Sequence, residues 1–349
     1  MFEYIGAIHI HSKFSDGTGE IPEIAKYANE IGLDYIIITD HNTLRGLHEG
    51  YEKWYNNTLC LVGCEINDKN NKNHYLAFGI NETFSTRTPA KEYVKKIKQI
   101  GGVGIIAHPH EKRTHMPEHP AYPWTEWNID DFDGIEIWNH MSEWMENLTE
   151  ENKYRSFIHP LKTITAPMQI TLKLWDELNL KRKVIGIGGV DAHAHKYNLI
   201  GFLEVEIFPY KVLFKSVRTH ILLDKELEVD NNPENLFQSK WLLYKSIKAG
   251  KCFIANDYVA NSKGFRFFAE QEGKIYQMGD FIESYKDVFL KVLLPQTFAK
   301  IKLIRNGILI DEIDGNEYSK KIDAPGAYRV EIYKDDRAWI YSNHIRIGI

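Results

Sequence analysis

Residues 35–42 read Tyr-Ile-Ile-Ile-Thr-Asp-His-Asn (YIIITDHN), four apolar residues followed directly by four polar ones. The run from Tyr35 to Thr39 is rich in β-branched side chains, which predicts a strand buried on both faces of a parallel sheet. Asp40 and His41 would then lie at the carboxyl end of that strand, where α/β barrels carry their ligands. The stretch therefore predicts an α/β fold with a functional cluster at one rim.

The same order of strand and helix repeats through residues 1–261. Strands are predicted at 4–10, 35–39, 59–66, 74–80, 103–107, 134–138, 184–188 and 202–207, and helices at 22–31, 44–55, 90–100, parts of 144–158 and 167–179, and 235–248. The first helix has Pro22 in its first turn and Gly32 at its end, as helices commonly do. This alternation predicts a parallel α/β architecture, and about seven strands fit a barrel.

The pattern changes after residue 261. Short apolar runs occur at 265–269, 287–294, 300–305, 308–313, 326–333 and 338–347. Turns such as Asn306-Gly307 and Pro325-Gly326 separate them. Short strands at this spacing, without helices, predict a small all-β sandwich. We therefore expect two domains, an α/β domain over residues 1–261 and a β-sandwich over residues 262–349 whose role stays open.

The composition is that of an ordinary globular chain, with 43% hydrophobic and 26% charged residues. The net charge of -5 gives no reason to expect sequence-independent binding of nucleic acid. The three cysteines show no paired framework, and we expect buried free thiols in a reducing compartment. The sequence shows no signal peptide and no apolar run long enough to span a membrane, so we expect a cytoplasmic protein without membrane partners.

Histidines and carboxylates follow the ends of successive predicted strands. His9 and His11 alternate in strand 4–10, so both imidazoles face one side, and Asp16 follows on the turn SKFSDG. Glu65 ends an apolar strand, where an unpaired buried carboxylate is costly, so it is either exposed or bound to positive charge. The other members of the set are His41, His74, His108, Asp191 and His193.

Each of these residues has an ordinary explanation when taken alone. His9 and His11 would suit a solvent-facing strand, and Asp40 would suit a capped loop. Their shared position at strand ends predicts one cleft that gathers them all. Divalent metal ions accept this mixture of imidazole and carboxylate ligands without thiolates, so we expect a metal site.

Five segments of the chain resemble the PHP (polymerase and histidinol phosphatase) family of metallohydrolases. They are HIHSKFSDG (9–17), TDHN (39–42), Gly63–Ile66 with His74, AHPH (107–110) and VDAH (190–193), in the family's order. The resemblance implies a distorted (β/α)7 barrel that carries a cluster of two or three metal ions. The layout from residue 202 onward also resembles a branch with an appended β-sandwich, which includes carbamate-cleaving enzymes.

The resemblance also implies a ligand scheme. One ion would be held by His9, His11, Glu65 and Asp191, a second by Asp16, His41 and His193, and a third by Glu65, as a bridge, with His74 and His108. His140 competes with His74, because some relatives take a histidine from the segment that matches GIEIWNH. Some relatives carry histidine where this chain has Asp16, so the second site departs from theirs. Zinc, manganese and iron all suit these ligands.

Such a cluster predicts hydrolysis. Closely spaced divalent ions lower the pKa of bound water and neutralise phosphoryl oxygens, so a metal-bridging hydroxide is the expected nucleophile. Asp191 or Asp16 would orient the water or accept its proton. His195, His110 or His140 would protonate the leaving group.

The expected substrate is a small phosphoester, and nucleic acid is expected only as a substrate. Arg113 and Arg218 are the favoured phosphate-binding residues, because guanidinium contacts suit phosphate, and His110 is a further candidate. Two other functions fit the same residues. One is hydrolysis of an amide, ester or carbamate, and the other is a metal-stabilised binding module without turnover. No oligomeric state is indicated.

Overall fold

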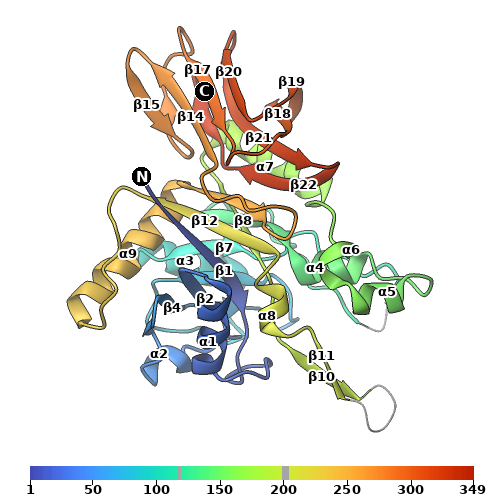
Figure 1. Ribbon diagram of the computed structural model, residues 1–349. Helices are drawn as coiled ribbons and strands as arrows, with labels where there is room; N and C mark the ends of the chain where they lie inside the picture. Colours follow the sequence, from blue (N-terminus) through green and yellow to red (C-terminus); the bar gives the residue numbers. More distant parts are fainter. Residues whose placement is uncertain (116–118, 199–203) are drawn as a thin grey trace.

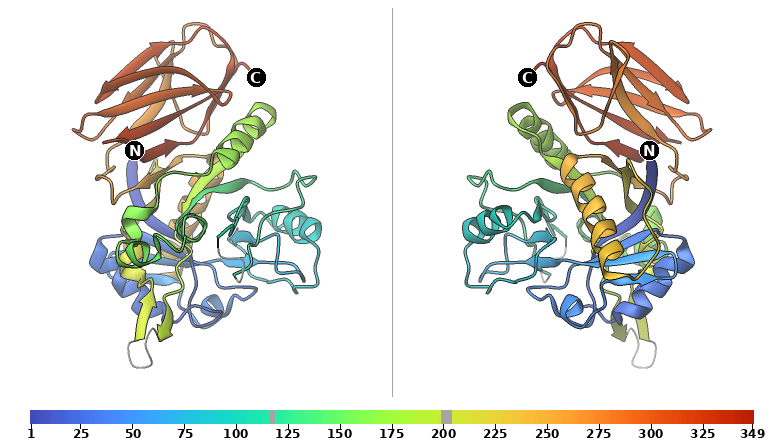
Figure 2. Two further views of the ribbon diagram at one scale, coloured as in Figure 1. Left: turned by 90° about the vertical axis from the view of Figure 1, so that its right-hand side faces the viewer. Right: turned by 90° about the vertical axis from the view of Figure 1, so that its left-hand side faces the viewer.

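The structure is a computed structural model that describes residues 1–115, 119–198 and 204–349. It has a mixed α/β fold, which confirms the predicted class (Figure 1). Strands and helices are interspersed as far as helix α9 (Pro233–Ala249), and the described elements that follow it are strands. Figure 2 shows the strands from β14 (Arg266–Gln271) onward, coloured orange to red, as a layer stacked on the rest of the molecule.

The largest sheet contains the strand predicted from YIIIT. The strands of its N-terminal part, in spatial order, are β13 (Cys252–Asn256), β12 (Val217–Leu223), β1 (Phe2–Ile10), β2 (Tyr35–Ile38), β4 (Thr58–Val62) and β3 (Lys53–Tyr55). Strands β1, β2 and β4 are parallel. Tyr35 and Ile37 pack into a core with α9, whereas Ile36 and Ile38 pack on the opposite face with α1 (Ile21–Ile31). Strand β2 is therefore buried on both faces, as predicted.

A second sheet has five strands. They are β5 (Cys64–Ile66), β6 (Tyr75–Phe78), β7 (Val103–Ile106), β8 (Gly134–Asn139) and β9 (Ile185–Gly189), in this spatial order. Both edge strands of this second sheet adjoin the large sheet. At one edge β5 follows β4 directly after Gly63. At the other, the backbone N–H of Val190, just after β9, donates to the backbone oxygen of Ile8 in β1 at 3.0 Å. The sheets are not closed into one barrel, so the predicted (β/α)7 barrel is not confirmed.

Nine helices lie in the described part of the chain. Besides α1 and α9 they are α2 (Arg45–His48), α3 (Ala90–Gln99), α4 (His140–Glu146), α5 (Lys153–Ile158), α6 (Pro160–Thr163), α7 (Gln169–Lys181) and α8 (Tyr210–Leu213). Helix α1 ends at Gly32, whose φ of 79° is the left-handed conformation that glycine adopts without strain. The predicted helix 44–55 is wrong beyond α2, because Lys53–Tyr55 pairs with β4 as strand β3. The helical pattern over 144–158 is divided between α4 and α5.

The remaining strands form a hairpin and the C-terminal layer. The hairpin consists of β10 (His195–Asn198) and β11 (Glu204–Ile207), and the first residues of the predicted strand 202–207 lie outside the described residues. A four-stranded sheet contains β15 (Lys274–Gln277), β14 (Arg266–Gln271), β17 (Phe289–Leu293) and β20 (Glu317–Lys321). The other strands of the layer are β16 (Phe281–Ile282), β18 (Ala299–Arg305), β19 (Ile308–Gly315), β21 (Gly326–Lys334), β22 (Arg337–Ser342) and β23 (Ile345–Ile347).

The C-terminal layer is continuous with the α/β part. Strand β22 pairs with β13, so one sheet of twelve strands runs through both. The guanidinium of Arg329 donates to both carboxylate oxygens of Asp176 on α7, at 2.7 and 2.8 Å, and His344 lies 2.7 Å from the same carboxylate. A separate β-sandwich is therefore not confirmed. Within the described ranges, every helix is too short or too polar to cross a membrane.

Candidate metal centre

The nine side chains predicted as metal ligands converge at one rim of the α/β part. His9 lies in β1 and Glu65 in β5, His74 precedes β6, and the other six follow the ends of β1, β2, β7 and β9. Four overlapping groups have ligand atoms within 4.8 Å of one another: His11, Asp16, His41 and His193; His9, Glu65 and His108; His9, His11 and Asp191; and His41, Glu65 and His74. The structure therefore brings together all nine residues of the predicted set.

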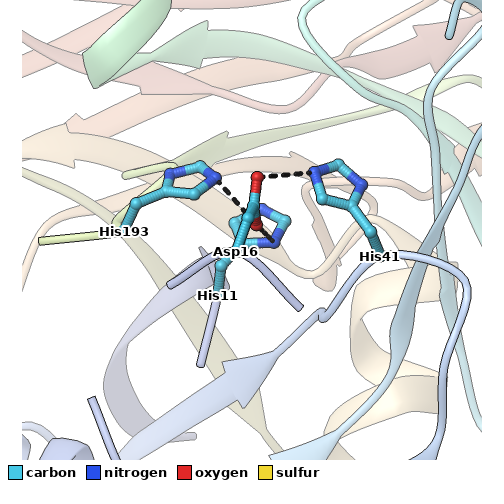
Figure 3. A group of neighbouring side chains, drawn as sticks. All are labelled: His11, Asp16, His41 and His193. Atoms are coloured by element: carbon cyan, nitrogen blue, oxygen red, sulfur yellow. Dashed lines mark ion pairs between the residues drawn. The ribbon is translucent and has the colours of Figure 1, made fainter. Parts of the chain in front are cut away.

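Asp16 lies at the centre of the first group. Figure 3 shows its carboxylate between the rings of His41 and His193, with His11 close by. The carboxylate oxygens lie 3.4 Å from Nε2 of His193, 3.5 Å from Nδ1 of His11 and 3.6 Å from Nε2 of His41. These separations exceed direct hydrogen bonds, so the four side chains surround a position that each of them faces.

Glu65 is the most crowded carboxylate of the centre. It is 1% exposed, and one of its oxygens, Oε2, lies 3.1 Å from Nε2 of both His9 and His11. The other oxygen, Oε1, lies 2.7 Å from Nδ1 of His74 and 3.2 Å from Nε2 of His108. Oε2 also lies 3.4 Å from Nδ1 of His41, so each oxygen faces a different set of histidines, as in a carboxylate shared between two cations.

The tautomer of His9 shows why a cation fits here. Its Nδ1 donates to Glu136 at 2.9 Å, so a neutral ring carries its lone pair on Nε2. That Nε2 faces carboxylate oxygens of Glu65 at 3.1 Å and of Asp191 at 3.4 Å. A lone pair opposite two carboxylates is repulsive unless a proton or a metal ion lies between them.

The pKa values of the cluster show the same demand for positive charge. Burial by itself lowers the pKa of His11, but Asp191 and Glu65 raise it to about 10. Burial likewise lowers the pKa of His108, whereas Glu111 and Glu65 raise it to about 9. Burial raises the pKa of Glu65, yet the surrounding histidines hold it well below its ordinary value. Protons and metal ions therefore compete for the same positions.

Several ring nitrogens of the centre have no hydrogen-bond partner among the described residues. They are both nitrogens of His11 and the Nδ1 atoms of His41 and His108, all of them buried. A buried polar atom left without a partner costs ~1–3 kcal/mol, which metal coordination would remove. All the donors are imidazole nitrogens and carboxylate oxygens, a set that binds divalent metal ions. The residues present therefore fit a metal centre.

The backbone is strained at three of these residues. His9 has a φ of 67°, His108 of 25° and Asp191 of 55°, all in the region that non-glycine residues rarely adopt. The register of β1 against β2 also shifts between Ile8 and Ile10, which marks a bulge at His9. Strain of ~1–3 kcal/mol per residue persists where the surrounding structure enforces it, commonly at functional sites.

Glu136, which the sequence analysis did not single out, orients two of these residues. It is 1% exposed on β8, and besides binding His9 it accepts the backbone N–H of His108 at 2.9 Å. Gly189 leaves room for it, because a Cβ atom there would collide with the Glu136 carboxylate. The signal in the sequence was a single acid within the apolar strand GIEIW, where an unpaired carboxylate would be costly.

Asp40 lies outside the four groups and orders the loop that carries Asp16. Its carboxylate accepts hydrogen bonds from the backbone N–H and the hydroxyl of Ser12, at 2.7 and 2.6 Å. It also accepts one from the hydroxyl of Ser15 at 2.7 Å. Asp40 therefore acts on the centre through the position of Asp16.

A cavity of about 410 Å³ opens beside the centre. Residues of the metal groups line it, among them Asp16, Glu65 and Asp191. Arg113 and His195, both predicted from the sequence, also line it. Arg113 is fixed by Glu111 at 2.8 Å, and the ring of His195 lies 4.9 Å from that of His193.

Three other predicted residues lie elsewhere. Arg218 pairs with Asp257 at 3.0 Å, and it is absent from the residues that line the cavity, so its position does not support a phosphate-binding role. His110 bonds to Thr171 at 3.0 Å and lines a different, smaller cavity. His140 is fully buried with its Nδ1 2.8 Å from the Ser216 hydroxyl, and it belongs to none of the four groups.

Comparison with known proteins gives three kinds of match. The sequence profile of the PHP domain matches residues 7–290. An uncharacterized protein of Methanocaldococcus jannaschii is 30% identical over 145 residues, which are 38% of this chain and 80% of that protein.

Two crystal structures are also similar. A two-domain protein of Bacteroides vulgatus, described as containing a predicted PHP-like metal-dependent phosphoesterase, is 15% identical with a TM-score of 0.48, over 98% of this chain and 95% of that one. A candidate metal-dependent phosphoesterase of Bifidobacterium adolescentis is 17% identical with a TM-score of 0.36, over 54% and 87% of the two chains.

Proposed function

Since the chain belongs to the PHP domain family, we propose that its metal centre hydrolyses small phosphoesters. The family and the cluster of histidines and carboxylates identify the chain as a metal-dependent hydrolase. The observation that carries the phosphoesterase proposal is a shared carboxylate, Glu65, beside a cavity that a guanidinium also lines.

Glu65 is the proposed bridge between two metal ions. Its Oε2 atom faces His9 and His11, which with Asp191 would hold one ion. Its Oε1 atom faces His74 and His108, which would hold another. A further ion would bind between Asp16, His41 and His193, the group drawn in Figure 3.

Bound divalent ions lower the pKa of a water molecule and neutralise the oxygens of the ester. The protein's own part is to position the reactants and move protons. Asp191, whose Oδ1 lies 3.6 Å from Nδ1 of His193, is placed to orient the attacking water and accept its proton. Asp16, whose side chain is half exposed, is the second candidate for this step. His195 lines the cavity outside the four groups and would donate a proton to the leaving oxygen.

Arg113 favours a phosphoester over an amide or carbamate. A phosphate monoester carries two negative charges on its terminal oxygens, so it gains from a further cation beside the metal ions. The carbonyl of an amide or carbamate has no such charge. Arg113 is 19% exposed and already paired with Glu111, so its guanidinium is held at the cavity wall before a ligand arrives.

An activity panel tests the proposal. Protein loaded with manganese, zinc or iron would be assayed on nitrophenyl phosphate, bis-nitrophenyl phosphate and small nucleotides, and on an aryl ester and an aryl carbamate. We expect hydrolysis of phosphoesters that a chelator abolishes. We also expect His41→Asn to lower the rate by at least the ~10–100-fold typical of disturbed metal surroundings. His48→Asn, at an exposed histidine of α2, is the control and should have no effect.

Two results would contradict the proposal. Hydrolysis of the ester or carbamate, with every phosphoester untouched, would assign the other hydrolytic chemistry. Metal binding without turnover of any substrate would indicate a metal-stabilised binding module.

We also propose that the two adjoining sheets act as one distorted barrel and that residues 262–349 form a β-sandwich domain. The backbone hydrogen bonds between the segment after β9 and β1 support the first point. A common core that contains Phe267 and Leu290 of one sheet and Val330 and Trp339 of the other supports the second. Limited proteolysis near residue 261 would test the boundary.

A further inference from the structure

The cavity beside the metal centre has two chemically different sides. One side carries the charged residues of the centre and Arg113. The other side is apolar and comes from α4, the residues after it, α5 and β11. Its side chains are Met141, Trp144, Met145, Leu148, Phe157 and Ile207.

The apolar side is built on one face of a helix. Met141, Trp144 and Met145 of α4 follow the spacing i, i+3, i+4, which places them on a single stripe, and Leu148 comes two residues after the helix ends. Such a stripe normally packs into a core. Here Trp144 and Leu148, each 2% exposed, do pack into the core, whereas Met141 and Met145 stay partly exposed, and all four border the cavity.

The indole of Trp144 has no free hydrogen-bonding group to offer a ligand on this side. Its indole Nε1 donates to the backbone oxygen of Ser156 at 3.2 Å, so its hydrogen-bonding capacity is already used. Its ring meets Phe157 edge-on, with the centroids 5.1 Å apart. Methionine side chains are flexible and polarizable, and they make favourable contacts with aromatic rings. The surface therefore suits an aromatic or branched aliphatic group.

We propose that the substrate is an amphipathic phosphoester whose apolar group packs against the side chains of Met141, Trp144, Met145 and Phe157 while its phosphoryl group meets the metal centre and Arg113. The inference rests on the proposed phosphoesterase function. A hydroxyl-rich group such as a sugar would lose its hydration on this surface without new partners, so sugar phosphates should be poor substrates. The cavity, at about 410 Å³, falls within the range of ~300–1,000 Å³ for small-molecule pockets.

Binding of phosphonates, which cannot be hydrolysed, tests this preference without relying on turnover. Naphthylmethylphosphonate and methylphosphonate would be titrated by calorimetry into the metal-loaded protein. We expect the naphthyl compound to bind at least about tenfold more tightly, because each buried apolar group adds to affinity. The double variant Met141→Gln/Met145→Gln keeps the side-chain length but adds an amide, and it should remove most of the preference.

Two controls separate this effect from a loss of structure. Met145→Leu keeps the surface apolar and should keep the preference. Ile170→Gln changes an exposed apolar residue on α7, outside the cavity, and should change nothing.

The inference is overturned if the two phosphonates bind equally, if neither binds, or if the double variant keeps the full preference. A parallel assay compares kcat/KM for naphthyl phosphate and glycerol phosphate. If the naphthyl phosphonate binds preferentially but neither ester is hydrolysed, the phosphoesterase proposal fails and the apolar binding surface stands. If both esters are hydrolysed equally and the phosphonates bind equally, the phosphoesterase proposal stands and the surface has no role in specificity.

Discussion

Replacing Glu136 by glutamine should weaken metal binding while leaving the fold intact. The Glu136 carboxylate accepts hydrogen bonds from Nδ1 of His9, from the backbone N–H of His108 and from the side-chain amide of Asn139, each at 2.9 Å. All three partners are donors. A glutamine side chain has one accepting oxygen and one donating amino group, so it cannot satisfy the donors on both sides.

Both orientations of the glutamine carry a cost. If its amino group faces His9, the ring must present its lone pair at Nδ1, which puts the proton on Nε2 and blocks coordination there. If the amino group faces His108 and Asn139, the backbone N–H of His108 and the side-chain amide of Asn139 both face a donor and lose their acceptor. An unsatisfied buried group and the loss of a charge-assisted hydrogen bond together cost about 2 kcal/mol. That corresponds to about a 30-fold rise in the metal Kd, within the range found when a partner of a ligating histidine is lost.

A competition assay with a metal-binding dye measures this Kd. The matched control is Glu143→Gln, which also removes a buried acid in this region. Glu143 accepts hydrogen bonds from Trp138 and Thr165 and belongs to none of the metal groups. Circular dichroism would confirm that both variants fold. An unchanged Kd in Glu136→Gln, or an equal rise in Glu143→Gln, would refute the reasoning.

Two further predictions concern the phosphate site and the junction with the C-terminal layer. Arg113→Met should lower kcat/KM on phosphoesters by about 10–150-fold, since a hydrogen bond to a charged group contributes ~1.5–3 kcal/mol. An equal loss of kcat/KM on a neutral aryl ester would contradict a role of Arg113 in binding phosphate. Burial raises the pKa of Asp176, but Arg329 and His344 lower it to about 2. The stabilisation that the ionised Asp176 carboxylate gives the fold is present above the pKa of about 3.9 that this group has in the unfolded chain, and it is lost as the pH falls through about 2. Urea unfolding should therefore show that the free energy of unfolding falls by ~2 kcal/mol between pH 4 and pH 2. Asp176→Asn should lack this acid-dependent loss, and the same loss in that variant would show that the effect arises elsewhere.

The sequence predicted that these side chains converge because most of them follow the ends of neighbouring strands. His9 lies near the end of β1, His11 follows it, and Asp191 and His193 follow β9, so their convergence required only that the two strands be neighbours. Strand β2 was likewise predictable, because an apolar β-branched run can only be buried on both faces.

The sequence could not show which distant residues meet. Glu136 was missed because its partner His9 lies 127 positions away in the chain. Arg218 was favoured because a guanidinium suits phosphate, but it pairs with Asp257, 39 positions further on, and it is not among the residues that line the cavity. The predicted helix 44–55 failed because pairing with β4 overrides local helical preference at Lys53–Tyr55. Tertiary pairing decided each of these cases.

Anomalous diffraction from crystals grown with manganese or zinc tests the metal centre most directly. We propose that ions bind among these nine residues, with at least one held beside Glu65 and another held by Asp16, His41 and His193. Anomalous peaks at these positions, which disappear after chelation, are the expected result. Crystals without an anomalous peak at Glu65, or with a single ion bound away from these nine residues, would contradict it.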